Sequence, residues 1–160
     1  MINITVLCVG KIKEKYFRDA IDEYSKRLDR YCKFQVVEVK DEPTPDSPSD
    51  AEKELVLKRE GKRILEKLPD FALVIPLCIE GKTMTSEKLA DFIDKAATAG
   101  TSHIVFIIGG SFGLSDEVKS RANLSLSFSP MTFPHQLMRV ILLEQIYRAF
   151  NINNGGKYHK

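Results

Sequence analysis

The apolar residues of this chain alternate between short continuous runs and longer segments in which they recur at intervals of three and four. The continuous runs are rich in β-branched residues and predict strands, over residues 2–9, 34–39, 71–79, 103–108 and 124–128. The periodic segments predict helices, over residues 13–31, 51–68, 87–99, 115–121 and 134–150. Strand and helix therefore alternate along the whole chain.

Two of these runs, residues 71–79 and 103–108, contain almost no polar side chain. Such strands are typical of the middle of a parallel sheet that is covered on both faces. The alternating order predicts an α/β fold, a mostly parallel open sheet with helices on both faces. Pro76 cannot donate to a strand ladder, so we expect regular pairing to end near it and to leave Leu77 and Cys78 at the carboxyl end of the strand.

Local signals set the expected ends of these elements. Ser49 or Asp50 can cap the second helix, and Thr85 or Ser86 can cap the third, which Gly100 ends. Residues 80–82 are expected to form a turn. Residues 41–50 hold three prolines and no apolar anchor, so we expect a mobile loop there. The basic residues of the first helix fit either a solvated face or a surface that meets RNA.

The last helix differs from the others, because apolar side chains surround it from Leu137 onward. A helix that is apolar all round must be buried all round, so we expect the sheet to cover one face and a second subunit the other. Thr132 or Phe133 can cap this helix, with Pro134 in its first turn. His135 and Arg139 share one face at its start, either as a site for an anionic ligand or as the solvated end of a core helix.

Composition narrows the class of protein. The chain has 160 residues, of which 43% are hydrophobic and 29% charged, with a net charge of +2. These values predict one soluble domain over residues 1–160 and exclude a strongly basic, tail-driven nucleic-acid binder. The three cysteines and three histidines lack the spacing of a disulfide framework or a metal site, so we expect no metal and a reducing cytoplasm. No apolar run approaches the roughly 20 residues that span a bilayer, so we expect no membrane partner.

Ligands bind such sheets at the carboxyl ends of the strands, where residues 77–78, 109–113 and 128–133 are expected to converge. Gly109 and Gly110 would let a flat ligand lie against their backbone. Backbone groups of residues 128–133 would read the edge of a purine. Apolar side chains would enclose the ligand, namely Leu77, Phe128, Met131 and Phe133. The pattern indicates an adenosine pocket.

The sequence gives weaker support to two other functions, a serine hydrolase and a dinucleotide-binding protein. Residues 109–113 match the G-x-S-x-G pattern of a serine hydrolase, with Ser111 as nucleophile, but the oxyanion motif that should precede it is absent. The first strand–helix turn has a single glycine, Gly10, instead of the three expected of a dinucleotide-binding motif.

Longer segments carry a resemblance to a known family. The segments FIIGGSFGL, LSFSPMTFPHQLMRVILLEQIYRAF and the terminal KYHK resemble the ribosomal RNA large subunit methyltransferase H family, of the SPOUT methyltransferase class. The opening VLCVGKIKEKY and the segment EKELVLKREGKRIL are also similar, so the resemblance runs the full length. It implies a deep trefoil knot in the C-terminal third, which the residues alone do not predict because knots are almost absent from proteins. It also implies a homodimer.

The resemblance further implies an activity, the transfer of a methyl group from S-adenosylmethionine to N3 of a pseudouridine in the large-subunit (23S) rRNA of the assembled ribosome. The cofactor site would comprise Leu77, Gly109, Gly110, Phe128, Ser129, Pro130, Met131, Thr132 and Phe133. We hypothesise that His135, or a water molecule, takes the proton from the acceptor nitrogen. Arg139 would hold a phosphate or stabilise charge on the base, and Tyr158 and His159 would stack on unpaired bases. A ribosome-binding factor without catalysis remains an alternative.

Overall fold

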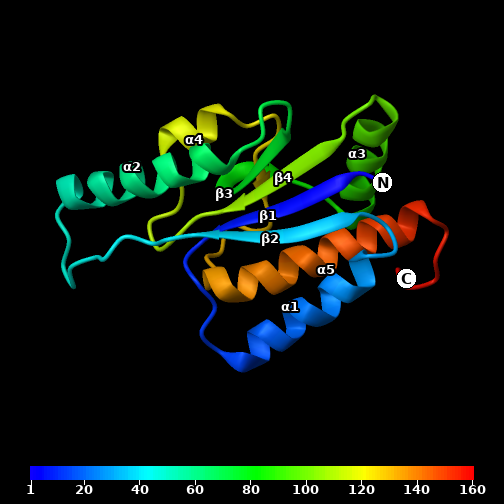
Figure 1. Ribbon diagram of the computed structural model, residues 1–160, viewed down its shortest axis with the longest axis horizontal. Helices are drawn as coiled ribbons and strands as arrows, with labels where there is room; N and C mark the ends of the chain where they lie inside the picture. Colours follow the sequence, from blue (N-terminus) through cyan, green and yellow to red (C-terminus); the bar gives the residue numbers. More distant parts are fainter.

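A single sheet of five parallel strands forms the centre of the protein. The computed structural model describes residues 1–160 (Figure 1). The strands are β1 (Asn3–Val9), β2 (Lys33–Val39), β3 (Leu73–Thr83), β4 (His103–Ile108) and β5 (Leu126–Ser127). Their order in the sheet is β2-β1-β4-β3-β5, and every neighbouring pair is parallel. The two apolar strands β3 and β4 lie inside the sheet, as their composition predicts.

Five helices cover the two faces of this sheet. They are α1 (Lys15–Leu28), α2 (Asp50–Lys67), α3 (Ser86–Thr98), α4 (Asp116–Ser120) and α5 (His135–Asn153). One apolar cluster joins the sheet to α1, α3 and α5, and a second joins its other face to α2 and α4. Figure 1 shows α1 and α5 side by side below the strands and α2 with α4 above them. The predicted α/β sheet with helices on both faces is confirmed.

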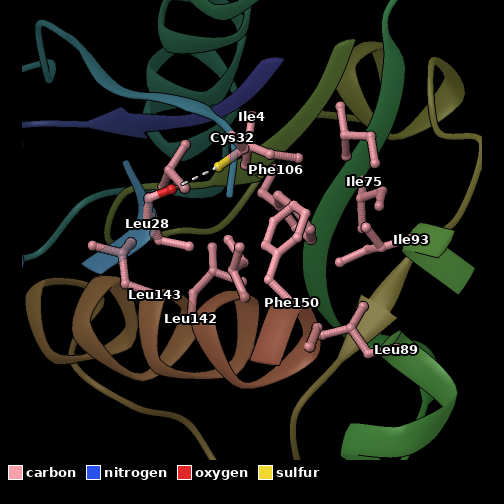
Figure 2. Packing of buried hydrophobic residues seen from close by; sticks show 14 of the residues in the cluster. Ile4, Leu28, Cys32, Ile75, Leu89, Ile93, Phe106, Leu142, Leu143 and Phe150 are labelled. Carbon is pink, nitrogen blue, oxygen red and sulfur yellow. Dashed lines mark hydrogen bonds between the residues drawn. The ribbon is translucent and has the colours of Figure 1, made fainter. Parts of the chain in front are cut away.

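The larger core lies between α5 and the sheet. Figure 2 shows Leu142, Leu143 and Phe150 pointing from α5 into the cluster, where they face Phe106 and Ile4. Four of these side chains are fully buried, namely Leu142, Leu143, Phe106 and Ile4. Burial of side chains of this size stabilises the fold by about 1.5–3 kcal/mol each. The same packing fixes the orientation of α5, and therefore of the residues at its start.

Strand β3 is longer than predicted. Its pairing with β4 ends at Pro76 opposite Ile107, as expected of a residue that cannot donate. The strand then continues to Thr83 instead of turning at residues 80–82, because it pairs with β5. Leu126 of β5 lies opposite both Leu77 and Lys82, so residues 78–81 form an irregular stretch between these two pairings. The sequence of β3 alone could not predict this extension, because it depends on the position of β5, which follows more than 40 residues later.

Helix starts agree with the predicted caps in two of three cases. The Ser49 hydroxyl accepts from the backbone N–H of Glu52 and completes a capping box, and the Thr85 hydroxyl accepts from the N–H of Lys88. Helix α5 instead takes Pro134 as its N-cap, with no side-chain cap. The prediction that Thr132 or Phe133 caps this helix was therefore wrong. The first N–H groups of α5 have no side-chain partner at the point where the helix begins.

Helix α5 is buried on one side only within this chain. Leu142, Ile146 and Ala149 are fully buried, whereas Leu137 and Ile141 are half-buried. A strip of apolar side chains thus remains open toward solvent, and the partner expected on that side stays a prediction. The single domain over residues 1–160 and the trefoil knot also stay predictions. None of the five helices is both long enough and apolar enough to cross a lipid bilayer.

Candidate active site

The three loops expected to converge do enclose one cavity at the carboxyl end of the sheet. Its volume is about 720 Å³, within the range of pockets that bind small molecules. Eight of the nine predicted cofactor residues line it, namely Leu77, Gly109, Gly110, Phe128, Ser129, Met131, Thr132 and Phe133. Pro130 lies in the same loop but is exposed and does not line the cavity.

Close backbone contacts explain the glycines of the loop after β4. A Cβ atom on Gly109 would lie 2.4 Å from the carbonyl oxygen of Gly113, so no side chain fits there. Gly113 has a φ of +83°, and its N–H donates to the Gly110 carbonyl over 3.0 Å. The glycines therefore form a tight turn on the cavity wall. The sequence predicted that Gly109 and Gly110 make room for the ligand, whereas the turn itself already requires glycine at Gly109 and Gly113.

The second wall is the segment between β5 and α5. No backbone N–H of Ser129–Phe133 donates to another backbone group, and that of Met131 donates to the Ser129 hydroxyl over 3.0 Å. The Ser127 hydroxyl donates to the Ser129 carbonyl over 3.3 Å. The N–H groups of Thr132 and Phe133 have no partner within the protein and are available to a ligand. Together with the uncapped start of α5, they give the cavity a polar edge beside an apolar lining.

His135, the first residue of α5, lines the cavity directly. Its Nδ1 atom is buried and has no hydrogen-bond partner. Burial lowers the pKa of His135 below its ordinary value, the positive charge of Arg139 lowers this pKa further, and Asp41 opposes both effects. The imidazole is consequently neutral at neutral pH, with a nitrogen free to accept a proton.

Arg139 does not line the cavity, although it lies one helical turn after His135. It is only 2% exposed. Its Nη1 donates to the Glu38 carboxylate over 2.6 Å, and its Nη2 donates to the Gly10 carbonyl over 2.7 Å. The guanidinium therefore ties α5 to the ends of β1 and β2. A phosphate or a base could reach it only by displacing Glu38, and the predicted role toward RNA stays a prediction.

Comparison with known proteins shows the family to which the chain belongs. Residues 2–159 match the family model described as Predicted SPOUT methyltransferase. The chain is 56% identical over 159 residues to the ribosomal RNA large subunit methyltransferase H of Clostridium botulinum (strain Alaska E43 / Type E3) and 59% identical to that of Bifidobacterium adolescentis. Each alignment covers 99% of this chain and 100% of the relative.

The chain belongs to the ribosomal RNA large subunit methyltransferase H family, a family of SPOUT methyltransferases. Its fold also resembles a solved structure, that of a probable methylase family protein from Haemophilus influenzae Rd KW20. That likeness has a TM-score of 0.53 at 14% identity and covers 99% of this chain and 70% of the other. At this identity it supports the fold alone.

In this SPOUT family member the C-terminal tail is folded back against the protein. The Tyr158 ring packs edge-on against Tyr147 with centroids 5.0 Å apart, and the Tyr158 hydroxyl bonds to Glu144. His159 contacts the carboxylate of Glu87 over 2.6 Å. Neither Tyr158 nor His159 lines the cavity. Their predicted stacking on RNA bases therefore requires the tail to leave these carboxylates, and it stays a prediction.

The serine-hydrolase alternative finds no support in this SPOUT methyltransferase. Ser111 is exposed and forms no side-chain hydrogen bond with a histidine or a carboxylate. No residue other than glycine has a positive φ, so the strained turn of a nucleophile elbow is absent. No group of three His, Cys, Asp or Glu residues lies close enough to hold a metal ion.

Sequence reasoning missed two charged residues of the methyltransferase cavity. Glu80 and Lys119 both line it, and the Lys119 ammonium contacts the Glu80 carboxylate over 2.5 Å. Glu80 was expected in a turn, and Lys119 is one of several charges on a short helix. The irregular stretch of β3 and the position of α4 bring them together, and no local signal in the sequence could have shown that.

Proposed function

We propose that the protein uses S-adenosylmethionine to methylate N3 of a pseudouridine in the large-subunit rRNA of the assembled ribosome. The observation that supports this most directly is the cavity formed by the three converging loops in a member of the SPOUT methyltransferases. The two relatives described above are large-subunit rRNA methyltransferases. A ribosomal substrate would place the protein in the cytoplasm.

The cavity fits the proposed cofactor on its own features. Leu77, Phe128 and Phe133 supply apolar walls, and the segment 129–133 supplies backbone groups that belong to neither a strand nor a helix. Gly109 and Gly110 contribute backbone alone to their part of the wall, beside the side chains of Ser111 and Phe112. When bound, S-adenosylmethionine supplies a methyl group activated by its sulfonium. The residues of this chain bind and orient it, which is the main contribution an enzyme makes to such a transfer.

His135 is the group best suited to take the proton from the acceptor nitrogen. It lines the cavity, it is neutral at neutral pH, and its Nδ1 has no partner inside the protein. A general base must lie within reach of the proton that it takes and must be unprotonated at the working pH. A water molecule held by the same imidazole is the alternative acceptor.

The RNA would meet the basic helix α1 and the C-terminal tail. Four side chains of α1 carry positive charge, namely Lys15, Arg18, Lys26 and Arg27, and Arg30 follows just after the helix ends. The net charge of the whole chain is only +2, so electrostatic attraction to free RNA is modest. An assembled ribosome would supply further contacts, which explains the preference we propose for it.

We also propose a homodimer that forms through α5. Leu137 and Ile141 leave an apolar strip on that helix which the chain itself does not cover. A second copy of the same strip would bury it, in the self-complementary manner of a two-fold interface.

The test is to incubate the purified protein with labelled S-adenosylmethionine and with ribosomes from a strain that lacks its gene. Free large-subunit rRNA serves as the parallel substrate, and the product is mapped by mass. We expect one methyl group on a pseudouridine in ribosomes and none in free RNA. Cofactor binding without transfer would contradict the proposal and favour a ribosome-binding factor without catalysis.

A further inference from the structure

The cavity contains one pair of formal charges whose purpose the proposed reaction does not explain. Among the residues that line it, only Glu80 and Lys119 are charged at neutral pH, since His135 is neutral. The contact between their side chains lowers the pKa of Glu80 and raises the pKa of Lys119, which keeps both of them ionised. The cavity therefore offers one anion and one cation side by side.

The two charges come from different elements of the cavity wall. Glu80 lies in the irregular stretch of β3 between the two pairings with β5, and Lys119 lies in the last turn of α4. Departures from regular pairing often direct a side chain toward a site. Here the register shift between Leu77 and Lys82 accompanies the appearance of Glu80 on the cavity lining.

The pair is accessible and weakly held. The Lys119 and Glu80 side chains are 34% and 62% exposed, respectively. Exposed ion pairs contribute about 0–1 kcal/mol to stability, because water competes for both partners. A ligand with its own opposite charges can therefore replace this contact at little cost, and each side chain keeps a partner of opposite sign.

We propose that Lys119 and Glu80 bind the α-amino acid headgroup of the methyl donor. The Lys119 ammonium would bind the α-carboxylate, and the Glu80 carboxylate would bind the α-ammonium. An α-amino acid carries both charges on one carbon, which matches two side chains that are in contact with each other. The inference rests on the proposed function and identifies the part of the ligand that the apolar walls do not recognise.

This assignment orients the ligand within the cavity. The adenosine lies along the Gly109 turn and residues 128–133, and the amino acid lies toward α4. The sulfonium that joins them then lies between these two ends. Glu80 and Lys119 act as binding residues and take no part in the proton transfer.

The test compares two ligands that share the thioadenosine part. S-adenosylhomocysteine carries the amino acid headgroup, and 5′-methylthioadenosine lacks it. We measure both dissociation constants by titration calorimetry for the wild type and for K119M, E80Q, K119R and K95M. Lys95 forms a similar exposed pair with Asp91 on α3 and does not line the cavity, so K95M is the matched control.

For K119M we expect S-adenosylhomocysteine to bind about ten- to a hundred-fold more weakly, the range for loss of a hydrogen bond between charged groups. Its affinity for 5′-methylthioadenosine should stay the same. E80Q should behave similarly, K119R should retain most of the preference, and K95M should change neither constant. Thermal unfolding of each variant shows whether it is folded.

Equal weakening of both ligands by K119M would overturn the inference, because it would assign the pair a structural role. Unchanged binding of S-adenosylhomocysteine to K119M and E80Q would overturn it as well. If the wild type binds neither ligand, the proposed function itself is refuted. This outcome is seen with the wild type alone, so it is distinguished from the two outcomes that concern the variants.

Discussion

At the residue scale, the environment of His135 predicts how the proposed reaction depends on pH. Its pKa is lowered by burial and by Arg139, and Asp41 is the charged group that opposes them. A lowered pKa means that the neutral, proton-accepting form persists to a lower pH than for a free histidine. We expect single-turnover methylation to be constant from pH 7 to 8 and to fall only below the ordinary histidine value of 6.5.

The variant D41N sharpens this prediction. Removing the Asp41 charge removes the influence that raises the pKa of His135, so the acid limb should move to lower pH. H135Q should abolish the limb and most of the turnover while S-adenosylhomocysteine still binds. If H135Q turns over as fast as the wild type, His135 is not the base. The proton would then pass to a water molecule that His135 does not hold.

Arg139 illustrates a role that only long-range structure reveals. Its position four residues after His135 predicted a shared face, but its guanidinium binds Glu38 and Gly10, both more than 100 residues earlier in the chain. We expect R139Q to lower the free energy of unfolding by about 2–3 kcal/mol, less than for a fully buried pair because Glu38 is partly solvated. Urea denaturation measures this loss. An R139Q protein of normal stability that no longer methylates ribosomes would instead support direct contact with RNA.

At the element scale, the parts of the fold that depend on local pattern could be predicted and those that depend on a distant partner could not. The apolar runs predicted β4 and the first part of β3 because a strand covered on both faces needs continuous apolar residues. The extension of β3 to Thr83 depends on β5, and the contact between Glu80 and Lys119 depends on that extension. The loops of the site could be located from the fold class alone, since ligands bind at the carboxyl ends of parallel strands.

The turn after β4 gives a prediction at this scale. In G109A the new Cβ would lie 2.4 Å from the Gly113 carbonyl oxygen, so the turn must shift. We expect a loss of about 1–3 kcal/mol in stability and markedly weaker binding of S-adenosylhomocysteine. K95M changes an exposed residue outside the cavity and should leave both unchanged. Wild-type affinity in G109A would show that the turn does not shape the cavity.

At the scale of the whole molecule, the open strip of α5 predicts how two copies meet. I141E places a charge in the middle of the apolar strip and should give a monomer of about 18.1 kDa in sedimentation, whereas the wild type should have twice that mass. F71E is the control, because Phe71 is 95% exposed, lies outside α5 and should leave the assembly intact. Dimers that persist in I141E would assign the interface to another surface.

The folded tail makes a second prediction at this scale. Removing residues 157–160 deletes Tyr158 and His159, which contact Glu144 and Glu87 in the free protein, without touching the cavity lining. We expect the truncated protein to bind S-adenosylhomocysteine normally and to lose methylation of ribosomes. Normal ribosome methylation without the tail would exclude it from RNA recognition.

The order in which the cavity walls occur along the chain has a consequence for synthesis. Strand β3 supplies one wall early, but Phe128–His135 close the cavity only after β5 has paired with the second half of β3. A chain is made from its N-terminus, so a nascent or prematurely released product that ends before Leu126 carries four of the five strands and no closed cavity. If the cavity binds the methyl donor as proposed, such incomplete products would lack the site that holds it.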